Sequence, residues 1–66
     1  MTAQEAVKEL QHIVLRVNTG GLEYDEGKAM ALPLIDIINV RGREIAKKHN
    51  KTFRPLAWGY ALRLGL

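Results

Sequence analysis

The sequence predicts an all-α fold: one small domain over residues 1–66, with a short helix, a longer central helix and a short C-terminal helix. Apolar residues recur at steps of three and four in two segments, which is the period of an amphipathic helix. A Gly-Gly pair and an Asn-Lys break separate the three segments. The chain has 66 residues and no cysteine, which excludes a disulfide framework and a thiolate metal site.

Residues 2–17 form the first predicted helix. Thr2 and Glu5 fit a capping box, in which each side chain accepts a hydrogen bond from the backbone amide of the other residue. The helix should end at Asn18–Gly21, because asparagine and glycine tolerate the left-handed conformation. Neither of the phosphate-binding motifs GxxxxGK[ST] and GxGxxG follows the Gly-Gly pair, so the pair is interpreted as a turn. The predicted apolar stripe contains Val7, Leu10, Val14 and Val17, with Ile13 beside it.

Pro33 leaves two alternatives for the central helix. In the first, Asp25 caps a short helix through Leu32, because proline lacks an amide hydrogen and would break or kink a helix that crosses it. In the second, the central helix begins at Pro33, where the missing hydrogen costs little. Gly42 lies in the apolar face, which suggests that another backbone approaches it closely. That face consists of Ile35, Ile38, Gly42, Ile45 and His49, widened by Leu34 and Ala46.

The last helix is predicted from Pro55 to Leu64, with Thr52 as a possible cap near its entry. It is apolar on more than one side, so we expect a second partner surface and a homodimer. A monomeric three-helix core that absorbs the same residues is the alternative. The expected partner surface consists of Leu56, Trp58, Ala61 and Leu64. The expected core consists of Val7, Leu10, Val14, Val17, Ile35, Ile38, Ile45, Leu56, Tyr60 and Leu62.

Charge is unevenly distributed along the chain. Residues 1–40 carry three cations and six acids, whereas residues 41–66 carry seven cations and one acid. Clustered cations in a small domain commonly neutralise nucleic-acid phosphates, although a basic face that only keeps the protein soluble is the alternative. We expect the phosphate contacts to come from Arg43, Lys47, Lys48, Lys51, Thr52 and Arg54.

The stretch "AKKHNKTFRPLAWGYALR" resembles the end of the histone fold, particularly in the small archaeal histones. Lys51-Thr52 followed by Phe53 is similar to the loop between the central and last histone helices, and Ala61 and Arg63 recur in the expected register. The resemblance implies a dimer in which this loop and the partner's matching loop lie beside DNA phosphates. The chain departs from the histone pattern at Pro33, at Asn50, where a loop arginine is expected, and at Ala57, where an acidic residue usually holds that arginine.

The same stretch is similar in spacing to a repressor-type helix-turn-helix, with a turn at His49-Asn50 and Leu56 in the following helix. Pro55 and the apolar segment 57–59 are poor base-reading residues, which need exposed Arg, Asn, Gln or Ser side chains. Both resemblances place residues 47–54 against nucleic acid. We therefore expect duplex DNA as partner, with weak sequence preference.

Other function classes have less support in the sequence. His12 and His49 have no ligand companion at metal-binding spacing, and no nucleophile accompanies His49, so we expect no metal, no cofactor and no enzymatic activity. The polar start and the absence of a long apolar run predict a cytoplasmic protein without a membrane segment. The alternative function is that of a phage- or plasmid-type adaptor or inhibitor, which grips a protein partner through the last helix with Trp58 as anchor.

Overall fold

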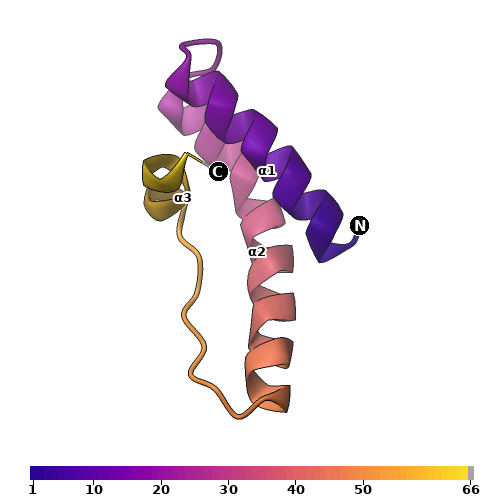
Figure 1. Ribbon diagram of the computed structural model, residues 1–66. Helices are drawn as coiled ribbons and strands as arrows, with labels where there is room; N and C mark the ends of the chain where they lie inside the picture. Colours follow the sequence, from indigo (N-terminus) through magenta and orange to yellow (C-terminus); the bar gives the residue numbers. More distant parts are fainter. Residues whose placement is uncertain (66) are drawn as a thin grey trace.

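The structure, a computed structural model, describes residues 1–65 and contains three helices and no strand in that range. The helices are α1 (Ala3–Asn18), α2 (Tyr24–Lys48) and α3 (Trp58–Leu64). Figure 1 shows α1 and α3 beside the N-terminal half of α2, while the connection between α2 and α3 returns along its C-terminal half. The molecule measures 40 × 22 × 15 Å, and α2 alone spans about 37 Å at 1.5 Å per residue. The predicted all-α fold is confirmed.

The local signals at the two ends of α1 are confirmed. Thr2 Oγ1 accepts a hydrogen bond from the Glu5 amide at 3.2 Å, and Glu5 Oε1 accepts one from the Thr2 amide at 3.0 Å, which completes the capping box. At the other end Gly20 adopts a φ of +86°, and the Gly21 amide donates to the Arg16 carbonyl at 2.8 Å. This is a Schellman-type ending, in which the left-handed residue lets the chain turn back toward α2.

The structure contradicts both alternatives for the start of the central helix. The helix α2 begins at Tyr24, Glu23 is its N-cap without a side-chain hydrogen bond, and Pro33 lies inside it. Asp25 therefore does not cap a short helix that ends at Leu32. Pro33 is on the exposed side of α2, while Leu34 and nearby residues are buried against α1. Packing on both sides of the proline compensates for the lost hydrogen bond, because most helix stability in proteins comes from tertiary contacts.

The core lies where all three helices meet. It consists of Ala6, Leu10, Ile13, Val14, Ala31, Leu34, Ile35, Trp58 and Ala61. Predicted core residues that pack partly against it are Val17, Ile38, Leu56 and Leu62, and Val7 is half-buried. The prediction is wrong for Ile45 and Tyr60, which are 44% and 54% exposed. Ile45 lies beyond the half of α2 that α1 and α3 cover, and the inward side of α3 is occupied by Trp58 and Ala61.

The predicted start of the last helix is also wrong. Residues 51–57 form neither helix nor strand, and α3 begins at Trp58 with Ala57 as N-cap. Asn39 of α2 explains this course, because its side-chain amide donates to the Leu56 carbonyl at 3.0 Å and accepts from the Leu56 amide at 2.7 Å. The Leu56 carbonyl therefore bonds to α2, and α3 starts one residue later with the hydrogen bond from Ala61 to Ala57.

The expected exposed partner surface on the last helix is largely absent. Trp58 is 4% exposed and Ala61 is fully buried, both within the chain's own core. Leu56 is half-buried, and Leu64 is the member of the set that remains exposed. The core of the single chain thus takes up Trp58 and Ala61, two of the four residues that suggested a partner; the predicted homodimer stays a prediction. Over residues 1–65, no helix is both long and apolar enough to cross a membrane.

Candidate functional site

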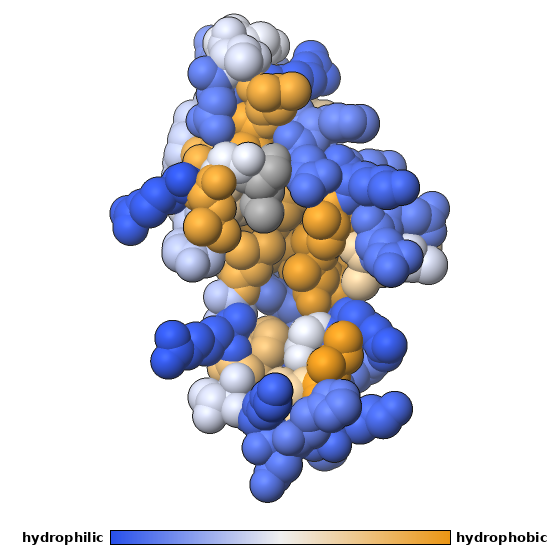
Figure 2. Space-filling view, viewed as in Figure 1, coloured by the Kyte–Doolittle hydropathy of each residue, from blue (hydrophilic) through white to orange (hydrophobic). Residues whose placement is uncertain are grey.

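The cationic side chains predicted to contact phosphates gather at one end of the molecule. We call this set the basic tip; it comprises Arg43, Lys47 and Lys48 of α2 and Lys51, Thr52 and Arg54 of the following connection. All six residues are exposed. Figure 2 shows mostly hydrophilic residues at this lower end, whereas apolar residues gather where α1 and α3 meet α2. At roughly 100° per residue, Arg43 and Lys47 lie on one face of α2 and Lys48 is rotated about 100° from Lys47, so the three cations cover part of the helix circumference.

The backbone of the basic tip is an ordered helix ending. Asn50 has a φ of 54°, its amide donates to the Lys47 carbonyl at 3.2 Å, and the Lys51 amide donates to the Ala46 carbonyl at 2.8 Å. Lys47 and Lys48 lie in the last turn of α2, where the negative end of the helix dipole favours cations. A last helix that began at Pro55, as predicted, would have added free backbone amides near the basic tip, but α3 begins at Trp58.

A groove separates the end of α2 from the connection that follows. Its volume is about 360 Å³. It is lined by Gly42, Ile45, Ala46 and His49 of α2 and by Lys51, Thr52, Phe53 and Arg54 of the connection. The structure thus brings three members of the basic tip to one groove, while Arg43, Lys47 and Lys48 lie outside its lining.

Phe53 fixes the wall of this groove opposite the helix. Its ring packs on Gly42, where an added Cβ would lie 3.1 Å from Phe53 Cε1. On the other side, the Arg43 guanidinium carbon lies 5.3 Å from the centre of the same ring, within range of a cation–π interaction. The close approach predicted at Gly42 is therefore made by an aromatic side chain and not by a backbone.

Asn39 and Phe53 position this site, and neither was predicted to do so from the sequence. Asn39 anchors Leu56, and Phe53 anchors the middle of the connection, so the residues between His49 and Leu56 are attached to α2 at two points. In the sequence, Gly42 on the apolar face was the signal that a bulky side chain such as Phe53 packs there. The position of Asn39 among apolar helix residues was the signal for its anchoring role, because a half-buried side-chain amide needs hydrogen-bond partners.

The cations of the basic tip have no acidic partner among residues 1–65. In residues 1–65 the one ion pair is Arg41–Glu44, at 3.3 Å between exposed side chains. The basic tip therefore presents uncompensated positive charge to any ligand.

No described protein family matches the chain, and no curated protein or solved structure is significantly similar to it. The histone-like and helix-turn-helix resemblances remain predictions from the sequence.

Proposed function

We propose that this protein is a non-catalytic nucleic-acid-binding protein that contacts phosphates through the basic tip with little sequence preference. The observation that supports this most directly is the gathering of five cations at one end of a 40 Å molecule, exposed and without acidic partners. Such a cluster attracts a polyanion over a distance and releases its counterions on binding.

The residues of the basic tip have different roles in this proposal. Lys51 and Arg54 line the groove and provide charge on either side of the Thr52 hydroxyl, which donates to a phosphate oxygen. Lys47 and Lys48 extend the positive surface around the helix end. Arg43 is oriented by the Phe53 ring. The lysines act as point charges, no amide side chain belongs to the set, and the Arg43 guanidinium lies over the Phe53 ring. Arg54 is then the main side chain of the set suited to base reading, so we expect mostly phosphate contact and weak sequence preference.

Binding to duplex DNA measured across a salt series tests the proposal. About five phosphate contacts give a log–log slope of affinity against salt near −4.5, since each contact contributes about −0.9. The combined variant Lys47→Ala, Lys51→Ala, Arg54→Ala should make that slope shallower by about 3. Far-ultraviolet circular dichroism should show unchanged helix content, because exposed charged side chains contribute little to stability.

The matched control removes three cations from the other part of the chain: Lys8→Ala, Arg16→Ala, Lys28→Ala. This variant has the same net charge as the first one and should retain the wild-type slope. Equal losses in both variants would mean that overall charge and not the basic tip determines binding. Absence of binding by the wild type at low salt would refute the proposed function.

The adaptor alternative has less support. Its expected anchors were Trp58 with the neighbouring Arg54 and Arg63; Trp58 is 4% exposed and belongs to the core, whereas the two arginines are exposed. Without Trp58 as an exposed anchor, the expected partner site retains only its two arginines, so nucleic-acid binding is the function we propose first.

A further inference from the structure

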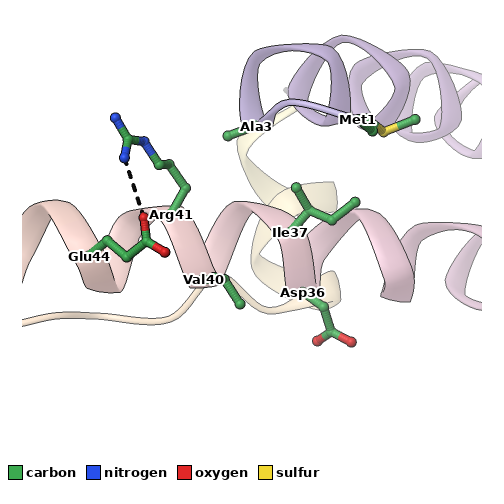
Figure 3. Close-up of a pocket in the computed structure, with 7 residues that line it drawn as sticks. All are labelled: Met1, Ala3, Asp36, Ile37, Val40, Arg41 and Glu44. Carbon is green, nitrogen blue, oxygen red and sulfur yellow. Dashed lines mark hydrogen bonds and ion pairs between the residues drawn. The ribbon is translucent and has the colours of Figure 1, made fainter.

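The helix α2 carries a second apolar stripe that is only partly covered by the rest of the chain. This stripe, the α2 stripe, comprises Met30, Pro33, Ile37 and Val40, spaced by three, four and three residues. Met30 is 47% exposed and Val40 is 55% exposed, whereas Ile37 is half-buried and packs partly against the core. Figure 3 shows Ile37 pointing toward the N-terminal segment and Val40 pointing away from it. Both line an open groove of about 370 Å³, together with Met1, Ala3, Asp36, Arg41 and Glu44.

Charges of opposite sign lie at the two ends of the α2 stripe. Glu26 is one turn before Met30, in the acidic first turn of the helix, and Lys48 is in its basic last turn. At roughly 100° per residue, both side chains project within about 40° of the direction of the stripe. Ile37 lies midway between them along the sequence. Glu44 also projects along the stripe, between Val40 and Lys48, and forms an ion pair with Arg41 at 3.3 Å. The stripe therefore has an apolar centre and an acidic end at Glu26, and at its other end a neutral Arg41–Glu44 pair is followed by the cation Lys48.

We propose that the α2 stripe binds a second copy of this chain, with the two α2 helices antiparallel. A two-fold axis near Ile37 pairs the apolar centre with itself and brings Glu26 of each protomer beside Lys48 of the other. A parallel arrangement would instead place Glu26 beside Glu26 and Lys48 beside Lys48, which repel. Only the antiparallel pairing of two copies brings Glu26 beside Lys48 at both ends of the stripe. A second copy of this chain is therefore the occupant that this surface fits.

This inference does not rest on nucleic-acid binding. The groove of the basic tip opens between α2 and the connection, on the side of α2 roughly opposite the α2 stripe. Dimer formation therefore leaves Lys51 and Arg54 accessible. Lys48 belongs to both surfaces, but the groove residues Lys51 and Arg54 and the apolar centre of the α2 stripe do not overlap, so failure of one proposal does not imply failure of the other.

Sedimentation of the intact chain at a series of concentrations tests whether the α2 stripe mediates dimerisation. The wild type should dimerise, and Val40→Asp should raise the dimer dissociation constant at least roughly tenfold, because it places an unpaired carboxylate in the apolar centre. The matched control is Leu15→Asp, on the far side of α1, where Leu15 is 60% exposed; this variant should dimerise like the wild type. A monomeric wild type at all accessible concentrations, or an unchanged Val40→Asp dimer, would overturn the proposal.

Charge reversal tests the orientation. Glu26→Lys and Lys48→Glu should each raise the dimer dissociation constant roughly five- to tenfold, and the double variant should return to within roughly twofold of the wild type. The two residues of one chain are about 33 Å apart along α2, so restoration requires contact between protomers. Lys48→Glu also reduces the net charge of +3, so weaker association in this variant is not caused by general repulsion. Failure of the double variant to restore association would refute antiparallel pairing.

Discussion

Substitution of Gly27 by alanine tests the packing that defines the fold. Gly27 is buried in the second turn of α2, where α1 and α3 both contact that helix. A Cβ at this position would overlap Val17 Cγ2 of α1, and it would lie 3.1 Å from Trp58 Cζ2 and 3.2 Å from Trp58 Cη2 of α3. The change adds one methyl group at the point where the three helices meet.

Two effects of opposite sign determine the outcome. Alanine is favoured over glycine inside a helix by about 1 kcal/mol. Overpacking a well-packed core costs about 1–3 kcal/mol, and the upper end applies here because neither neighbour moves easily. Val17 is β-branched and restricted at χ1, and Trp58 is 4% exposed with its ring enclosed. We expect Gly27→Ala to lower the free energy of unfolding by about 1–2 kcal/mol.

Urea unfolding followed by far-ultraviolet circular dichroism measures this change, with all variants at one protein concentration. Gly42→Ala is the matched control on the same helix: its Cβ meets only the half-exposed Phe53 ring, at 3.1 Å. That ring can shift toward solvent, so the control should be neutral or up to about 1 kcal/mol more stable. Val17→Ala combined with Gly27→Ala should destabilise less than the two single changes summed. A Gly27→Ala variant more stable than the wild type would refute the three-helix contact.

Two further predictions concern single hydrogen-bonded residues. Asn39→Ala should lower the free energy of unfolding by about 2 kcal/mol, since it removes two hydrogen bonds to Leu56 worth about 1 kcal/mol each. Asn39→Asp should destabilise at least as much in the same urea assay, because it keeps the acceptor for the Leu56 amide but turns a carboxylate oxygen toward the Leu56 carbonyl. Equal stability of Asn39→Ala and wild type would contradict the anchored connection. The hydrogen bond from the Thr2 amide, followed by that from the Thr2 side chain, lowers the pKa of Glu5 from its ordinary value of 4.5. The resulting stability is present above pH 4.5 and is lost as the pH falls through the lowered value, so the difference in stability between wild type and Glu5→Gln should shrink on acidification. Glu9→Gln, one turn further along α1, is the control, and a difference independent of pH would argue against the capping box.

The sequence predicted α1 well because the signals for its ends act over short distances. Thr2 and Glu5 are three residues apart, and the Gly20 turn is closed by hydrogen bonds that reach back no further than Arg16. Such interactions form within one or two turns of chain, so residue identity and spacing suffice to predict them. The position of the basic tip at the end of α2 was predicted for the same reason, since the cations are close together in the sequence.

The two prolines show where local reasoning fails. Pro33 is unfavourable inside a helix, yet burial of Ala31, Leu34 and Ile35 against neighbouring helices keeps α2 continuous across it. Pro55 is a favourable helix start, yet the connection remains extended because Asn39, far away in the sequence, binds Leu56. Both outcomes depend on tertiary contacts between distant residues, which local propensity does not encode.

The central helix also shows why periodicity alone does not predict which surface is buried. Ile35 and Ile38 form one stripe and Ile37 and Val40 form another, rotated around the same helix, and both have helical spacing. Contact with α1 buries Ile35, whereas the α2 stripe remains partly or largely exposed. A single helix therefore has two apolar sides, and α1 and α3 cover mainly one of them. The other side has opposite charges at its two ends, so it is complementary to the same surface of a second, antiparallel copy. The proposed dimer would therefore explain the exposed stripe on α2 without a different protein partner.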